Sequence, residues 1–206
     1  MAAYEKRACG KSAENRLTEL VVVLDRSGSM QGLEADMIGG YNALLESNRV
    51  LPGRANVSLV LFNDESHVVH DRIDIREARK LDKRDFRPSG CTALLDAVGD
   101  AVHHTQMVQK VLPPAYRADD VILAIATDGY ENASTRYSYS EVKRLLGEVQ
   151  REYGWEVLFL GANIDVAREA EDLGIRADRA VAYEASPMGC AHAFSNMSRL
   201  SEDVRR

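Results

Sequence analysis

The sequence predicts an α/β protein with a doubly wound, Rossmann-like, mostly parallel β-sheet and one antiparallel hairpin at the sheet edge. Apolar runs that fit strands buried on both faces alternate with segments in which apolar residues recur at helical spacing. The two central runs, residues 20–24 and 121–126, each lead into an aspartate-containing loop. A third run, 57–62, is followed by a short polar turn and an alternating segment, as in a hairpin. Strands that alternate with helices through right-handed crossovers form such a sheet.

The first half of the chain is predicted to form one strand–helix unit, the hairpin and a second helix. β-branched residues dominate the first run, and Pro52 and Gly53 end the helix that follows it. Pro113 and Pro114 end the second helix. The expected elements are a strand at 20–24, a helix from residue 33, hairpin strands at 57–62 and 67–75, a turn-rich loop at 87–92 and a helix from 94 to about 111.

The second half repeats the alternation of strands and helices. Helical spacing of apolar residues places the helices, and Asn163 or Asp165 is expected to cap the second of them. The expected elements are strands at 121–126, 155–160 and 180–183 and helices at 139–153, 164–173 and about 191–204. The edge hairpin is one surface available for self-association.

Length and composition indicate one globular domain over residues 17–206, preceded by a polar, flexible lead-in at 1–16. The chain has 206 residues, of which 45% are hydrophobic and 28% charged. No apolar run approaches the roughly 20 residues of a membrane helix, and the first residues lack the apolar region of a secretory signal. We therefore expect a cytoplasmic protein without a membrane segment.

Charge and cysteine content argue against a phosphate-neutralising nucleic-acid binder and against a zinc or disulfide protein, although local basic patches stay possible. The net charge is −6, whereas a protein that binds nucleic acid by neutralising phosphates needs a clustered basic surface. The cysteines, Cys9, Cys91 and Cys190, are far apart and form no CxxC pair. We expect free thiols rather than disulfides or a zinc site, because zinc sites show paired ligands at short spacing.

Polar side chains follow the two central strands. Asp25, Ser27 and Ser29 alternate in the loop after the first strand, Asp128 follows the strand at 121–126, and the loop before the second helix adds Thr92. Ligands of doubly wound sheets bind at the carboxyl ends of the strands, so these oxygens are expected to converge there. Carboxylate and hydroxyl oxygens suit a hard ion, Mg²⁺, Mn²⁺ or Ca²⁺, and two carboxylates leave that ion able to bind an external one.

These residues lie in the strings VVVLDRSGSM, SGCTALLDAV and LAIATDGYENAS, which resemble the von Willebrand factor A family with its metal-ion-dependent adhesion site (MIDAS). That family's motif is Asp-x-Ser-x-Ser, a threonine and an aspartate on three loops. This chain matches every motif position, and the match in order and context extends over roughly residues 17–185.

The resemblance implies a role for each residue. Ser27 and Ser29 ligate the ion directly, Thr92 ligates it directly or through water, and Asp25 and Asp128 act mostly through water or hydrogen bonds. A glutamate or aspartate of a protein partner takes the open position. The resemblance is to small stand-alone bacterial or phage cytoplasmic members, and it implies a non-enzymatic binding module in a stress-response or assembly complex, such as a chelatase-like one.

Two alternatives remain open at this stage. In the first, Asp25 and the serines only cap the helix that follows. In the second, the protein is a metal-dependent hydrolase or phosphatase with Asp25 as nucleophile, since phosphoaspartate enzymes also carry an aspartate after the first buried strand. Against it, the position of their second carboxylate is Ser27 here, and no lysine lies in a matching loop. The sequence contains neither GxxxxGK[ST] nor GxGxxG after a strand, which excludes the common nucleotide-binding motifs.

Residues next to the motif have both structural and functional interpretations. Cys91 is expected to be a packed small residue rather than a redox-active group. Asn163 and Asp165 either rim the site or cap a helix, and the five histidines are expected to be ordinary surface or core residues. The remaining candidates for partner contact are Met30, Gln31, Tyr130 and Glu131.

Overall fold

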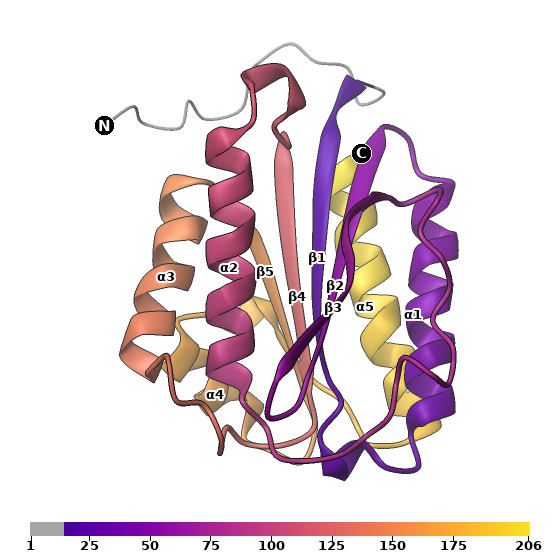
Figure 1. Ribbon diagram of the computed structural model, residues 1–206, viewed down its shortest axis with the longest axis vertical. Coiled ribbons are helices and arrows are strands. Elements are labelled where there is room, and N and C mark those ends of the chain that lie inside the picture. The colour runs from indigo at the N-terminus through magenta and orange to yellow at the C-terminus, as the bar shows by residue number, and fades with distance from the viewer. Residues whose placement is uncertain (1–14) are drawn as a thin grey trace.

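Six strands in the order β3-β2-β1-β4-β5-β6 form the sheet of the computed structural model, which describes residues 15–206 (Figure 1). The predicted lead-in at 1–16 falls mostly on residues 1–14, outside the described part. The strands are β1 (Leu17–Asp25), β2 (Arg54–Phe62), β3 (Ser66–Asp74), β4 (Asp120–Thr127), β5 (Glu156–Gly161) and β6 (Ala180–Ala182). The helices are α1 (Glu34–Arg49), α2 (Leu94–Val111), α3 (Tyr139–Glu152), α4 (Val166–Leu173) and α5 (Pro187–Arg205).

The predicted mixture of parallel and antiparallel pairing is confirmed. β1 pairs in parallel with β2 and β4, and the pairs β4–β5 and β5–β6 are parallel as well. β2 and β3 pair antiparallel, which makes β3 the hairpin strand at the sheet edge. Every residue of β1 is buried, because helices cover both faces of this central strand.

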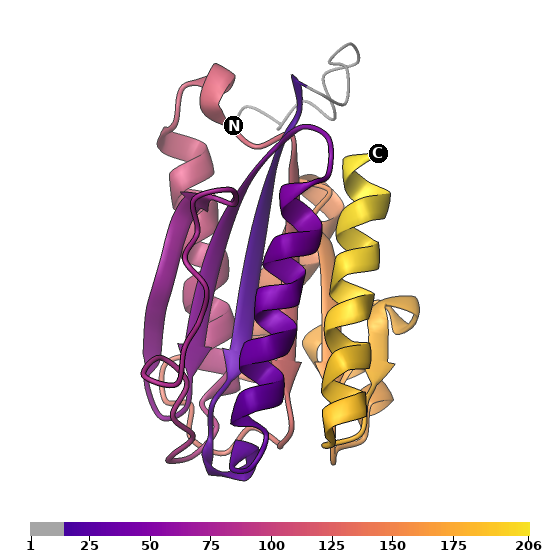
Figure 2. The ribbon, with the colours of Figure 1, turned by 90° about the vertical axis from the view of Figure 1, so that its right-hand side faces the viewer.

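Each face of the sheet has its own apolar core. Leu20, Val22 and Leu24 face α1 and α5, which lie side by side in Figure 2. Val21 and Val23 face α2 and α3. Successive residues of a strand point to opposite faces, so a strand buried on both sides needs the continuous apolar run that the sequence shows.

The terminal helix begins earlier than predicted, at Pro187 instead of about residue 191. The side chain of Ser186 accepts a hydrogen bond from the backbone N–H of Gly189, and proline is well suited to the first helical position because its missing N–H would have no partner there. The helix packs on α1 through buried Phe194 and Met197. Among the described helices, none combines the length and apolar character of a membrane span.

The topology places the carboxyl ends of β1 and β4 side by side at a switch point. After β1 the chain continues into α1 on one face, whereas β4 is preceded by α2 on the other face. Both strands end at the lower edge of the sheet in Figure 1. Asp25 is the last residue of β1, and Asp128 directly follows β4. In open α/β sheets this crevice is where ligands bind.

Candidate metal centre

Asp25 forms the floor of the centre. Its side chain is fully buried at the end of β1. Its Oδ1 atom accepts a hydrogen bond from the backbone N–H of Ser27 at 2.6 Å, and its Oδ2 atom accepts one from the hydroxyl of Thr127 at 2.6 Å. Asp25 therefore links the loop after β1 to the end of β4 and fixes the position of the neighbouring serines.

A chain of oxygen atoms leads from this floor toward solvent. The hydroxyls of Ser27 and Ser29 lie 3.0 Å apart, and Ser29 donates a hydrogen bond to Oδ1 of Asp128 at 2.5 Å. Ser27 and Asp128 are buried, whereas Ser29 is exposed. Residues 28–30 form one turn of 3-10 helix, which carries the backbone from the buried serine to the exposed one. The site thus opens at Ser29.

Thr92 reaches the same place from the loop before α2. A Cβ atom built on Gly129 would lie 3.7 Å from the hydroxyl oxygen of Thr92 and 3.9 Å from that of Ser29, so both hydroxyls approach one point. Thr92 is held there by Asn132, whose side-chain oxygen accepts from the N–H of Thr92 and whose own N–H donates to the Thr92 carbonyl. The structure therefore brings all five predicted residues together.

Gly90 shapes the loop that carries Thr92. Its φ of +74° lies in the left-handed region that favours glycine. A Cβ atom at this position would lie 1.7 Å from Oδ2 of Asp64. The glycine carbonyl also accepts a hydrogen bond from the N–H of Gly28, at 3.1 Å, which ties this loop to the Asp25 loop.

The centre concentrates negative charge. Burial raises the pKa of Asp25, hydrogen bonds from Thr127 and Ser27 lower it in part, and the charge of Asp128 raises it further. Burial also raises the pKa of Asp128. The leading causes of the two shifts include no cationic side chain. Oδ2 of Asp128 is buried and has no hydrogen-bond partner in the described structure.

These features fit a divalent cation. A buried carboxylate oxygen without a partner is costly unless an ion or water binds it. Oxygen ligands at about 2.1 Å in octahedral geometry lie about 3 Å apart, and the serine hydroxyls show that spacing. Within residues 15–206, no group of three or more His, Cys, Asp or Glu side chains could hold a metal ion. The donor set is thus rich in hydroxyls, which suits a hard ion better than zinc.

Two supporting residues escaped the sequence analysis, and both belong to the string that contains Asp128. Thr127 donates to Asp25, and Asn132 holds Thr92. Glu131, a candidate for partner contact, instead accepts hydrogen bonds from the backbone of Leu95, Ala133 and Ser134 and so joins the loop to α2.

For the other residues next to the motif, one expectation is confirmed and two are wrong. Asp165 caps α4 by accepting from the N–H of Arg168, as one of the two interpretations required. Met30 is fully buried in the core and cannot contact a partner. Cys91 is exposed rather than packed, and its hydrogen bond to Asp64 raises the pKa of the thiol.

Tyr130 and Gln31 are exposed next to the centre, so partner contact by either remains an expectation. The adjacent histidines of α2 bind different partners: His103 contacts the hydroxyl of Tyr137, and His104 contacts Asp71.

No protein-family model and no curated protein matches the sequence. The structure is similar to that of the von Willebrand factor type A protein from Catenulispora acidiphila, at 19% identity and a TM-score of 0.60 over 91% of this chain and 43% of the other. It is also similar to the von Willebrand factor domain of the type V pili tip protein Mfa5 from Porphyromonas gingivalis, at 12% identity and a TM-score of 0.62 over 93% and 97%.

A third similar structure is proximal thread matrix protein 1 from the mussel byssus, with a zinc-occupied MIDAS motif. The identity is 16% and the TM-score 0.55, over 92% of this chain and 45% of the other. The chain spans less than half the length of the first and third of these chains. Identities this low establish a common fold.

Proposed function

We propose that this chain, which has the von Willebrand factor A fold, is a divalent-metal-dependent protein-binding module. Ser27, Ser29 and Thr92 would hold the ion directly, with Asp25 and Asp128 around it. The bound Mg²⁺, Mn²⁺ or Ca²⁺ would supply an open position that attracts a glutamate or aspartate of the partner. The resemblance to small bacterial members extends the proposal to a cytoplasmic stress-response or assembly complex.

One observation carries the proposal: within the described residues, the buried Oδ2 atom of Asp128 has no partner, and it lies where two other loops bring the hydroxyl oxygens of Ser27, Ser29 and Thr92 together. The protein stabilises this arrangement through hydrogen bonds within its own loops, so the donor atoms are in place before an ion arrives. The zinc-occupied MIDAS of the mussel byssus protein supports metal binding by this kind of site.

The hydrolase alternative is disfavoured by the position of Asp25. A nucleophile has to reach the substrate, but Asp25 is fully buried and both its oxygens accept hydrogen bonds within the protein. Turnover of an aryl phosphate in Mg²⁺ that is abolished in Asp25→Asn would favour the enzyme instead.

Thermal unfolding tests the proposal directly. The protein is unfolded in chelator and in millimolar Mg²⁺, Mn²⁺ or Ca²⁺, alongside Ser29→Ala and the control Ser195→Ala, which removes an exposed hydroxyl of α5. We expect an ion-dependent rise in Tm that Ser29→Ala reduces and Ser195→Ala preserves. If no ion raises the Tm of the wild type above its value in chelator, the proposal fails.

A further inference from the structure

The segment between β3 and α2, residues 75–93, is long and irregular and yet firmly attached. It contains no helix or strand. Irregular loops of more than about 15 residues are uncommon in compact domains and are usually functional or disordered. Here Ile75, Ala78, Leu81 and Phe86 are buried in the core on the α1 face, so the segment is packed against the protein.

Hydrogen bonds from α1 add to this attachment. The side chain of Asn42 donates to the carbonyl of Leu81 and accepts from its N–H. Arg49 donates to the carbonyls of Ile75 and Ala78. A segment held by apolar anchors and by its backbone presents its remaining side chains in a fixed arrangement.

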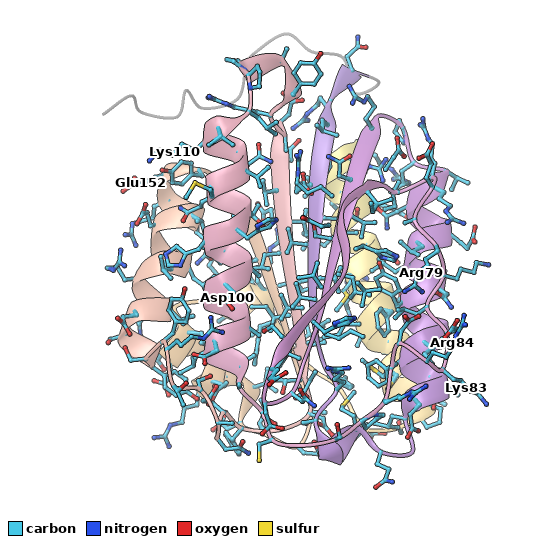
Figure 3. The ribbon with its side chains drawn as sticks, in the orientation of Figure 1. Arg79, Lys83, Arg84, Asp100, Lys110 and Glu152 are labelled. Atoms are coloured by element: carbon cyan, nitrogen blue, oxygen red, sulfur yellow. The ribbon has the colours of Figure 1, made fainter. Side chains whose placement is uncertain are left out.

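Those remaining side chains are mainly basic. We call residues 76–87 the basic strip, because it carries six basic residues against three acidic ones in a chain of net charge −6. All six basic side chains are exposed. Figure 3 shows Arg79, Lys83 and Arg84 together beside α1. The basic residues are Arg76, Arg79, Lys80, Lys83, Arg84 and Arg87, and the acidic ones are Glu77, Asp82 and Asp85.

Internal ion pairs leave part of this charge free. Arg79 pairs with Asp85, Arg84 pairs with Asp82, and Lys80 pairs with Glu46 of α1. No acidic partner of Lys83 or Arg87 is present among residues 15–206. The strip therefore offers unpaired positive charge to solvent.

The basic strip continues directly into the metal centre. The N–H of Ser89 donates to the carbonyl of Arg26, and the carbonyl of Gly90 accepts from the N–H of Gly28, so the residues that follow the strip are joined to the Asp25 loop. Thr92 follows two residues later. A polypeptide bound at the ion and extended along this segment would pass the side chain of Arg87 and then that of Lys83.

We propose that the basic strip is the second part of the docking surface and binds an acidic stretch of the partner protein. This inference rests on the proposed function, because the same partner supplies the carboxylate that binds the ion. Charge complementarity carries it: carboxylates on either side of the metal-bound one would meet the unpaired cations, which favours acidic partners over others. The overall negative charge and the acidic residues within the strip disfavour a nucleic acid.

Two fluorescent peptides of equal length probe this surface. One contains a single glutamate in a Gly-Ser background, and the other carries several further acidic residues beside that glutamate. In Mg²⁺ we expect the acidic peptide to bind roughly tenfold more tightly at low salt, because exposed ion pairs contribute modestly and are screened. Lys83→Glu/Arg87→Glu should remove this advantage.

The control Lys110→Glu/Arg151→Glu reverses the same number of charges at the ends of α2 and α3, far from the strip; Figure 3 labels Lys110 and Glu152 there. It should keep the tenfold advantage. An advantage that survives in Lys83→Glu/Arg87→Glu, or that both double variants lose equally, overturns the inference.

Further outcomes of the peptide experiment distinguish a failure of this inference from a failure of the proposed function. Suppose that the single-glutamate peptide binds in Mg²⁺, that Ser29→Ala abolishes this binding, and that the acidic peptide binds no more tightly. The inference about the basic strip is then wrong, and the metal-dependent function stands. If the acidic peptide binds the strip equally in chelator and neither peptide responds to any ion, the metal-dependent function fails. A third outcome is that a single-stranded oligonucleotide binds, that Lys83→Glu/Arg87→Glu abolishes this binding, and that the acidic peptide does not bind. The strip would then bind a nucleic acid and not an acidic protein partner, and the inference would be overturned.

Discussion

Replacement of Asp128 by asparagine is expected to stabilise the protein in chelator and to destabilise it in the presence of the ion. Asp128 is 2% exposed, and its Oδ2 atom has no partner within the described structure. An unsatisfied buried group costs about 1–3 kcal/mol, and a charged one costs more than a neutral amide. The introduced amide keeps an acceptor for Ser29, so we expect a gain of about 1 kcal/mol, or a rise of roughly 2–4 °C in Tm at this chain length.

With the ion the effect has the opposite sign. An ion present at one hundred times its Kd stabilises the folded protein by about 2.7 kcal/mol, which corresponds to a rise of roughly 5–11 °C in Tm. Asp128→Asn removes one of the two carboxylates of the centre and should lose most of this rise. The wild type would then be the more stable protein in the ion and the less stable one in chelator.

The assay is thermal unfolding by circular dichroism in chelator and in saturating Mg²⁺, Mn²⁺ or Ca²⁺. Asp203→Asn, which changes an exposed aspartate of α5, is the control and should follow the wild type in every buffer. The reasoning is refuted if Asp128→Asn lowers Tm equally in chelator and in the ion. Its carboxylate would then serve the fold and not an ion.

Three further predictions concern the surrounding loops. Asn132→Ala should reduce the ion-dependent rise in Tm by at least half, because it removes the side chain that accepts a hydrogen bond from the N–H of Thr92. An unchanged rise would show that Thr92 needs no such support. Gly90→Ala should cost about 1–3 kcal/mol in urea unfolding, since φ is positive and the added Cβ meets Asp64; a neutral effect would contradict that clash. Burial raises the pKa of Glu169 above 4.5, so its contribution to stability is present below that pH and is lost as pH rises through the folded-state pKa. The stability of the wild type relative to Glu169→Gln should fall over that range, and a constant difference would be the contrary result.

The order of strands and helices was predictable because burial leaves a strong trace in the sequence. β1 and β4 are covered on both faces, so their central residues, 20–24 and 121–126, are all apolar. Helical spacing of apolar residues marks the buried faces of α2 and α3. The start of α5 was less predictable. Its first turn, 187–190, depends on a cap by Ser186 and on a proline at the first position, and neither changes the apolar pattern.

The candidate site was predictable to the extent that its residues end parallel strands. Asp25 and Asp128 had to meet because β1 and β4 are neighbours, and Ser27 and Ser29 follow Asp25 closely. Met30 was misjudged because the 3-10 turn at 28–30 returns the chain to the core, which residue type alone does not reveal. The support of Thr92 by Asn132 depends on backbone hydrogen bonds between two loops and leaves no periodic signal.

The basic strip shows why composition and spacing miss some surfaces. The apolar anchors of this segment are Ile75, directly before the strip, and Ala78, Leu81 and Phe86 within it. They lie among charged residues, and their spacing as a set fits neither a helix nor a strand. Such a stretch is typical of a solvated loop until its backbone contacts with α1 are known. The apolar anchors are buried, whereas all six basic side chains are exposed. The anchors therefore hold positive charge in place at the border of the metal centre. A loop that only joined β3 to α2 would not require that arrangement, whereas a surface that selects acidic partners would.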